Sequence, residues 1–229
     1  MFKRLILLRH GQSTWNLENR FTGWHDVDLS NKGINEAINA GKILKDKNIF
    51  PDIVFTSVQK RALKTCYLTL EFNNRLWIPH YKSYKLNERH YGALTGLNKK
   101  ETVDKYGKKL VNKWRRSYKT TPPLLTKESK YYPGHDDCYK NISNLPLGES
   151  LETTYNRVIP YWNEVILNKL KNNNILIVAH GNSLRSLIKY LENISDESVE
   201  KLSIPTGTPI IYDFDIKMKI INKYIINKN

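Results

Sequence analysis

The sequence predicts an α/β fold in which a Rossmann-like, mostly parallel sheet carries helices on both faces. Three short apolar runs, Leu5–Leu8, Ile53–Thr56 and Ile175–Ala179, have the length and composition of buried strands. Each run is followed by polar residues and then by a stretch with helical periodicity. Strands that alternate with helices in this way are typical of a parallel sheet that is covered on both sides.

Four segments have the apolar spacing of helices. In Asn31–Lys47 the apolar residues return every three or four positions, and Arg61–Phe72 and Leu184–Leu191 are further helical segments. A fourth, Tyr155–Leu170, should be interrupted or kinked near Pro160, because proline lacks the N–H that a helix interior needs.

The middle and the end of the chain depart from this alternation. Pro209–Phe214 and Ile220–Ile226 have the pattern of two late strands, which a hairpin would join. Between Asn87 and Pro146, prolines and many aromatic and basic residues break the pattern. We therefore expect a single domain over residues 1–229, with residues 87–146 as a lid-like insertion packed over the sheet edge.

Composition excludes several classes of protein. The 229 residues are 40% hydrophobic and 26% charged, and no apolar run is long enough for a membrane span. The first apolar run, Leu5–Leu8, is shorter than the roughly 7–15-residue core of a signal peptide. Two cysteines, Cys66 and Cys138, imply no disulfide framework, so we expect a cytoplasmic protein without a membrane partner.

The net charge of +15 indicates an anionic partner, which could be nucleic acid, a membrane surface or a phosphorylated metabolite. The lysines are spread along the whole chain, however, and an overall Lys, Asn and Ile bias explains the charge equally well. The chain has no basic tail and no basic motif interleaved with aromatic residues, so we expect no nucleic-acid partner.

Two of the predicted strands end in the same way, with a histidine followed by a glycine. The first leads to Arg9-His10-Gly11 and another leads to Ala179-His180-Gly181. Ligands of open α/β sheets bind beyond the carboxyl ends of the strands, and glycine allows the backbone to approach them closely. A single histidine there is most often a core residue, but two at equivalent positions indicate a functional site.

Arginines favour phosphate as the ligand of this site. Arg9 precedes His10, and Arg61 begins the helix that follows the second strand. Guanidinium groups bind phosphate through paired hydrogen bonds, and helix N-termini add backbone donors. Alone, Arg61 would be read as a solvated helix residue; together these groups predict a phosphate pocket that holds a nucleophilic imidazole.

Motifs along nearly the whole chain resemble those of one family. They are Leu8-Arg9-His10-Gly11-Gln12-Ser13, Trp15-Asn16, Phe21-Thr22-Gly23-Trp24, Asp28-Leu29-Ser30, Thr56-Ser57, Arg61-Ala62, Leu86-Asn87-Glu88-Arg89-His90-Tyr91-Gly92, Leu94-Thr95-Gly96-Leu97-Asn98-Lys99, Trp114-Arg115-Arg116, Ala179-His180-Gly181-Asn182-Ser183-Leu184-Arg185 and Pro205-Thr206-Gly207. The Arg-His-Gly motif is similar to the signature of the histidine phosphatase superfamily. Asn-Glu-Arg-His-Tyr-Gly with the paired arginines resembles the 2,3-bisphosphoglycerate-dependent phosphoglycerate mutases.

The resemblance implies roles for five catalytic residues. His10 would carry the phosphoryl group as a phosphohistidine, and His180, Arg9 and Arg61 would stabilise the group during transfer. Glu88 would be the general acid and base, although a glutamate here could equally be a structural partner of Arg61 or Arg89. The family also implies 2,3-bisphosphoglycerate as the primer, no metal, and a homodimer or homotetramer that acts on small phosphoglycerates.

The resemblance also implies a set of substrate-binding residues. These are Arg9, His10, Gly11, Gln12, Ser13, Thr14, Trp15, Asn16, Thr22, Gly23, Arg61, Glu88, Arg89, His90, Tyr91, Lys99, Arg115, Arg116, Gly181 and Asn182. Lys99, Arg115 and Arg116 would hold the substrate carboxylate and distal phosphate, although paired arginines on a helix are often only a solvated face. His90 also fits a structural role.

Three functions remain open at this stage: the mutase, a histidine phosphatase that acts on a sugar or glycerate phosphate, and a basic binding protein without catalysis. The segments Glu88–Tyr91 and Trp114–Arg116 favour the mutase.

Family members commonly carry a longer C-terminal tail than the residues after Ile226. Because a tail can exclude water from the site, we expect the phosphohistidine here to hydrolyse faster than in those family members. The exception would be a site that the segment Tyr131–Asn144 covers instead.

Overall fold

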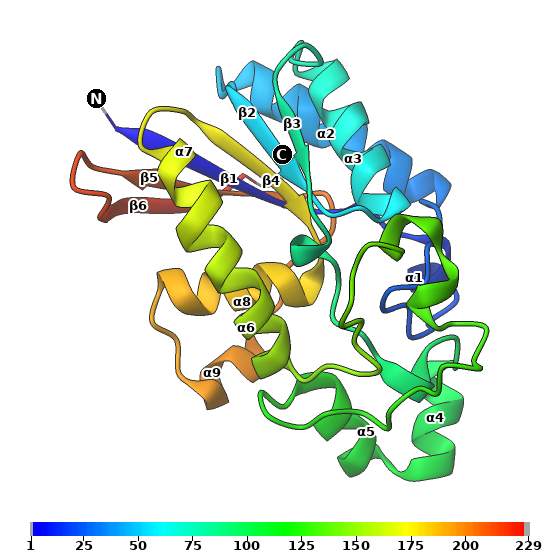
Figure 1. Ribbon diagram of the computed structural model, residues 1–229. Helices are drawn as coiled ribbons and strands as arrows, with labels where there is room; N and C mark the ends of the chain where they lie inside the picture. The colour runs from blue at the N-terminus through cyan, green and yellow to red at the C-terminus, as the bar shows by residue number, and fades with distance from the viewer. Residues whose placement is uncertain (1, 227–229) are drawn as a thin grey trace.

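A computed structural model describes residues 2–226 and has a six-stranded central sheet (Figure 1). The strands are β1 (Lys3–Arg9), β2 (Ile53–Thr56), β3 (His80–Lys82), β4 (Ile175–Ala179), β5 (Pro209–Phe214) and β6 (Ile220–Ile225). Their order across the sheet is β3-β2-β4-β1-β5-β6. The first four of these pair in parallel, and β5 and β6 are antiparallel. The predicted α/β class, the mostly parallel sheet and the late hairpin are confirmed.

Helices cover both faces because successive strand residues point to opposite sides. On one face, Leu5 and Leu7 of β1 pack with α6 (Leu151–Tyr161) and α8 (Gly181–Leu191). On the other, Ile6 and Leu8 pack with α2 (Asn31–Asp46) and α3 (Lys60–Phe72). All four strand residues are fully buried.

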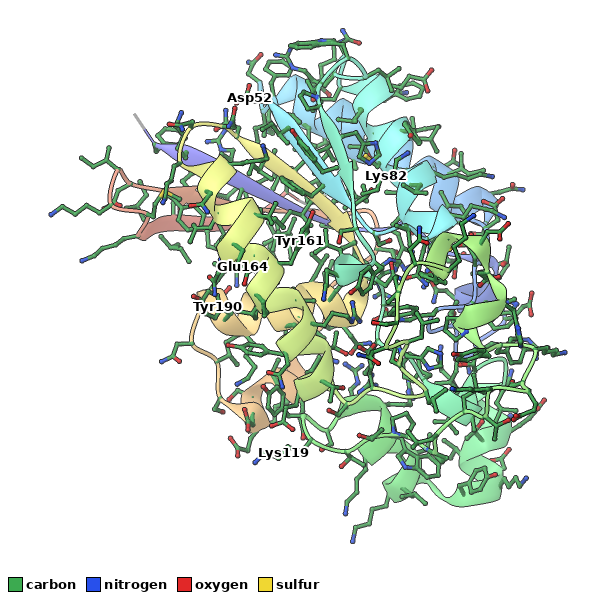
Figure 2. The ribbon with its side chains drawn as sticks, viewed as in Figure 1. Asp52, Lys82, Lys119, Tyr161, Glu164 and Tyr190 are labelled. Carbon is green, nitrogen blue, oxygen red and sulfur yellow. The ribbon has the colours of Figure 1, made fainter. Side chains whose placement is uncertain are left out.

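The predicted helix around Pro160 is divided. Pro160 lies inside α6, and a π-helical segment, Trp162–Ile166, follows before α7 (Leu167–Leu170). The interruption expected from the missing proline N–H is therefore present. Figure 2 shows this segment beside α8, where the Tyr190 hydroxyl donates to Asn163 at 3.1 Å.

Several elements were not predicted. They are α1 (Thr14–Leu17), α4 (Lys99–Tyr106), α5 (Lys108–Arg116), α9 (Asp196–Lys201), strand β3 and the short 3₁₀ turns η1 (Tyr84–Leu86), η2 (Gly92–Leu94), η3 (Pro133–His135) and η4 (Asp137–Tyr139). Helices α4 and α5 pack against each other below the sheet in Figure 1.

The segment 87–146 lies beyond the carboxyl ends of the parallel strands (Figure 1), whereas the sequence interpretation placed it over the sheet edge. It contacts the loop after β1, and Tyr118 packs against Leu151 of α6 and Val199 of α9. The ring of Tyr139 packs 4.9 Å from that of Trp24, and its hydroxyl accepts from Asn87 at 2.9 Å. This corrects the expected position, because the loops rather than an edge strand offer the aromatic partners.

Within residues 2–226, no helix has both the length and the apolar character that crossing a membrane requires. Residues 227–229, which include the tail expected to be short, lie outside the described residues.

Candidate active site

The two strand-end histidines face each other. Strands β1 and β4 are neighbours with Arg9 opposite Ala179, and the backbone N–H of His10 donates to the Ala179 carbonyl at 3.0 Å. Parallel pairing therefore brings His10 and His180 to the same end of the sheet. Their ring centroids are 5.0 Å apart, and both residues are almost completely buried.

Within the described chain, His10 has a neutral imidazole with one ring nitrogen free of hydrogen bonds. Its Nδ1 lies 2.7 Å from the Gly11 carbonyl oxygen, which can only accept, so the proton resides on Nδ1 and Nε2 carries the lone pair. Burial, together with the positive charges of Arg61 and Arg9, holds the pKa of His10 well below its usual range. The imidazole is therefore neutral at physiological pH.

His180 is neutral for the same reasons: burial, Arg61, His10 and Arg9 lower its pKa well below the usual range. Its Nε2 pairs with the Ser57 hydroxyl at 2.7 Å. Its Nδ1 is buried and has no hydrogen-bond partner among the described residues. Buried polar atoms are normally paired, so this unpaired nitrogen is an exception among the buried groups of the site.

Two arginines are fixed beside the histidines by backbone carbonyls. Arg61 is 1% exposed and donates to Gly23 at 2.8 Å and to His25 at 3.1 Å. Arg9 donates through Nη1 to Ile204 at 2.8 Å, while its buried Nε has no partner in the described part of the chain. Within residues 2–226, neither guanidinium is neutralised by a directly bound carboxylate.

Glu88 is held by one of its two carboxylate oxygens. Its Oε1 accepts from the backbone N–H of Arg89 at 2.8 Å, and from the backbone N–H and Nδ2 of Asn182 at 3.0 and 2.9 Å. Three donors on Oε1 leave Oε2 as the oxygen that can exchange a proton. Glu88 is 8% exposed and lines a cavity together with His10.

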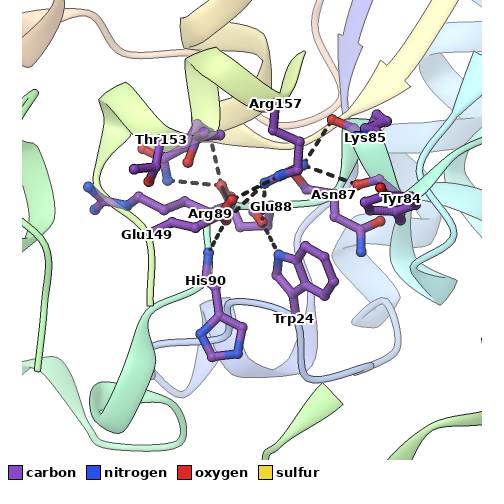
Figure 3. Close-up of polar contacts among 12 residues, drawn as sticks. Trp24, Tyr84, Lys85, Asn87, Glu88, Arg89, His90, Glu149, Thr153 and Arg157 are labelled. Carbon is purple, nitrogen blue, oxygen red and sulfur yellow. Dashed lines mark hydrogen bonds and ion pairs between the residues drawn. The ribbon is translucent and has the colours of Figure 1, made fainter. Parts of the chain in front are cut away.

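A buried ion pair fixes the backbone around Glu88 (Figure 3). Arg157 binds both oxygens of Glu149, at 2.8 and 2.9 Å, and also donates to the backbone carbonyls of Tyr84, Lys85, Asn87 and Glu88. Glu149 in turn accepts from the His90 N–H at 2.8 Å. The loop that carries Glu88 is thus tied to α6.

The cavity is strongly cationic. Its lining residues are Arg9, His10, Asn16, Arg20, Thr22, Gly23, Arg61, Glu88, Tyr91, Lys99, Arg115, Arg116, Gly181, Asn182, Arg185, Leu202, Ser203 and Ile204. Seven carry positive charge, and Glu88 is the only carboxylate among them. Burial lowers the pKa of Lys99 and of Arg115, which lie near one another. Such a site suits a small molecule with several negative charges.

The sequence profile of the histidine phosphatase superfamily (branch 1) matches residues 5–226, which is nearly the whole chain. The chain belongs to this superfamily. Solved structures share its fold. A mycobacterial hydrolase has a TM-score of 0.74 at 20% identity, over 99% of this chain and 98% of that chain.

Two further structures are similar to this histidine phosphatase superfamily member. A mycobacterial glucosyl-3-phosphoglycerate phosphatase in complex with VO3 has a TM-score of 0.69 at 23% identity, covering 92% of each chain. A putative alpha-ribazole-5'-P phosphatase from Escherichia coli has a TM-score of 0.70 at 22% identity, over 94% of this chain and 93% of that chain.

Most of the residues that the family resemblance implied lie together in the cavity. The exceptions, which do not line it, are Gly11, Gln12, Ser13, Thr14, Trp15, Arg89, His90 and His180, the last of which lies directly behind His10. Gly11 permits close packing, because a Cβ there would lie 2.1 Å from the Gly33 oxygen. Ser13 caps α1, and Trp15 packs 4.6 Å from the His25 ring.

The remaining exceptions also make internal contacts. The N–H of Gln12 donates to Glu36 and that of Thr14 to the Asp28 carbonyl. Arg89 is buried and donates to the carbonyls of Trp114 and Arg115, which satisfies the end of α5. In this superfamily member, Arg89 thus positions the helix that carries Arg115 and Arg116.

Sequence reasoning missed Arg20 and Arg185 in the cavity and Arg157 and Glu149 behind it. Arg185 does occur in the quoted motif after His180, which was the available signal. Arg157 carried no signal, because Glu149 precedes its helix and its other partners are backbone carbonyls about 70 residues away. In residues 2–226 of this superfamily member, no group of three or more His, Cys, Asp and Glu side chains could hold a metal ion.

Proposed function

We propose that the protein is a phosphoglycerate mutase, which interconverts 3-phosphoglycerate and 2-phosphoglycerate through a phosphohistidine on His10 primed by 2,3-bisphosphoglycerate. One observation carries the proposal: the cavity contains two groups of cations. Arg9 and Arg61 lie beside His10, and the segment 87–146 adds Lys99, Arg115 and Arg116. A bisphosphate, or a phosphate with a carboxylate, fits two cationic groups better than a simple phosphomonoester does.

The proposed chemistry needs placement and positive charge more than covalent help. The Nε2 lone pair of His10 attacks one phosphorus of the bisphosphate and the P–O bond to the glycerate breaks. The departing oxygen takes a proton from Glu88. In turnover, Glu88 removes the proton from the free hydroxyl of 3-phosphoglycerate, whose oxygen attacks the phosphohistidine; this gives 2,3-bisphosphoglycerate and frees His10. After the bisphosphate reorients, its other phosphoryl group passes to His10, Glu88 protonates the departing oxygen, and 2-phosphoglycerate is released. Arg9, Arg61 and His180 stabilise the charge on the transferring group.

A histidine phosphatase is the second candidate. The similar structures include enzymes named as phosphatases, one of them for a glucosyl-3-phosphoglycerate. Such an enzyme would use the same His10, Arg9, Arg61 and His180, but water would accept the phosphoryl group. The cations from residues 87–146 favour the mutase over a phosphatase of simple phosphomonoesters, because a bisphosphate intermediate carries a second phosphate that needs its own cationic group.

A mutase assay with and without added 2,3-bisphosphoglycerate tests the proposal. Conversion of 3-phosphoglycerate to 2-phosphoglycerate should depend on the primer and should exceed the release of inorganic phosphate. His10→Ala should abolish both reactions. Primer-independent phosphate release without isomerisation would establish the phosphatase instead. We further propose that residues 1–229 form one domain and that the protein is a cytoplasmic homodimer or homotetramer. Light scattering measures the mass of the assembly.

A further inference from the structure

Asn182 lies between a carboxylate and a guanidinium. Its backbone N–H and its Nδ2 donate to Oε1 of Glu88, and its Oδ1 accepts from Nη1 of Arg185 at 2.9 Å. Nδ2 also lies 3.2 Å from the Tyr91 hydroxyl. A guanidinium can only donate, so only one orientation of the carboxamide satisfies both neighbours. Reversing the amide would place Oδ1 against the Glu88 carboxylate and Nδ2 against the cation.

The guanidinium that selects this orientation is itself fixed. Arg185 is 4% exposed, and its Nε donates to the Leu202 carbonyl at 3.0 Å. Its Nη2 reaches the Glu200 carbonyl, in the last turn of α9, at 3.4 Å. Burial lowers the pKa of Arg185 to about 10, so it remains a cation at neutral pH. Each of its three nitrogens donates to a protein group although the residue lines the cavity.

We infer that Arg185 is a positioning residue, which fixes the orientation of Asn182 and so holds Glu88 with Oε2 available for proton transfer. The inference rests on the proton-transfer role proposed for Glu88. Without Arg185, Asn182 loses one of the two partners that fix its amide orientation, and Nδ2, the side-chain donor among the three on Oε1, is held less firmly. The carboxylate can then rotate away from the reacting oxygen.

Two phosphate esters with different leaving groups report on this role. Glycerol 3-phosphate releases an alkoxide that needs a proton, whereas p-nitrophenyl phosphate releases a stable anion. The measured quantity is the ratio of kcat/KM for the first ester to kcat/KM for the second. Glu88→Gln should lower this ratio, and Arg185→Met should lower it by about 10- to 100-fold, the cost of a misplaced catalytic group.

Lys189→Met is the matched control. Lys189 also lies on α8 and also ties it to the segment leading into α9, through the Ile194 carbonyl and Asp196, but it does not touch Asn182 or Glu88. The kcat/KM ratio of Lys189→Met should equal that of the parent protein. The double variant Glu88→Gln/Arg185→Met should have the ratio of Glu88→Gln alone, because both changes act through one carboxylate.

Each other outcome overturns a stated part of the argument. A parent-like ratio in Arg185→Met, with a lowered ratio in Glu88→Gln, overturns the positioning role and leaves the proposed function intact. A parent-like ratio in Glu88→Gln overturns the role of Glu88 and the inference with it. Additive effects in the double variant show that Arg185 acts elsewhere. If Arg185→Met does not fold, Arg185→Gln replaces it. This variant lacks the guanidinium that contacts Asn182, Leu202 and Glu200, so its kcat/KM ratio should fall by the same factor.

Discussion

The imidazole rings of His10 and His180 lie 5.0 Å apart at an interplanar angle of 58°. They are both neutral, yet their hydrogen bonds distinguish them. His10 directs its Nδ1 proton to the Gly11 carbonyl and keeps the Nε2 lone pair free, whereas Nε2 of His180 is engaged by Ser57. This asymmetry supports the proposed roles of His10 as the nucleophile and His180 as the supporting group.

Labelled 2,3-bisphosphoglycerate should therefore phosphorylate His10. The label should be acid-labile and base-stable, as expected for phosphohistidine, and should be absent from His10→Ala. His180→Ala should still become labelled, but more slowly, because it loses one stabilising group. His135→Ala, a change at an exposed histidine in η3, serves as the control. Label that survives in His10→Ala and vanishes in His180→Ala would reverse the two roles.

Arg115→Ala and Arg116→Ala should each raise the KM for 3-phosphoglycerate by about tenfold or more, the equivalent of one charged hydrogen bond. Both arginines line the cavity from the last turn of α5. Lys113→Ala removes an exposed cation from the same turn and should leave KM unchanged. Steady-state kinetics check this, and Glu88→Gln should mainly lower kcat. Parent-like KM values in both arginine variants would refute the proposal that Arg115 and Arg116 bind the substrate.

The success of the sequence predictions follows the strength of the local pattern. Strands β2 and β4 have the predicted bounds, because each is a short, continuous apolar run that polar residues follow. Strand β3 was missed because His80–Lys82 forms the sheet edge and has no apolar run. Helix α5 was missed because basic residues dominate it and it buries only Val111 and Trp114.

The site was predictable where backbone position alone placed a residue at a strand end, as for His10 and His180. It was not predictable where a side chain acts through distant backbone. Arg157 joins α6 to the loop of Glu88 across about 70 residues, and no spacing in the sequence reveals such contacts. Similarly, Arg89 belongs to the motif but binds the end of α5.

Chelation should not affect activity. The positive charge in the cavity comes from arginines and Lys99, and no candidate metal cluster occurs in the described stretch 2–226. The mutase assay in excess EDTA should therefore give the rate measured without it. Loss of activity that manganese restores would point to a different, metal-dependent chemistry.

Arg157→Met should destabilise the protein by about 3–5 kcal/mol, because it leaves Glu149 buried without its cation. The side chains of Arg157 and Glu149 are only 9% and 5% exposed. Urea unfolding measures the loss, and Arg157→Met/Glu149→Met should recover part of it. Lys64→Met breaks an ion pair with Asp28 whose side chains are 49% and 41% exposed, and should cost about 1 kcal/mol or less. Equal losses in the two single variants would show that burial does not decide the effect.

The pH dependence of stability should reveal a neutral His90. Burial lowers its pKa to about 4, with Arg157 adding to the effect and Glu149 opposing it, and its Nδ1 accepts from the Gly92 N–H at 3.0 Å. The unfolded chain takes up the proton at about pH 6.5, so it binds more protons than the folded state below that pH. Stability is therefore fully present above pH 6.5 and falls as the pH decreases toward 4.

His90→Gln removes this titration, so its free energy of unfolding should fall less between pH 6.5 and 4, by at most about 3 kcal/mol. Urea unfolding at several pH values measures the difference. The KM of this variant at pH 7.5 decides between the two roles considered for His90. An unchanged KM with a flatter pH profile indicates a structural histidine, whereas parallel stability profiles and a raised KM would make it a substrate-binding residue.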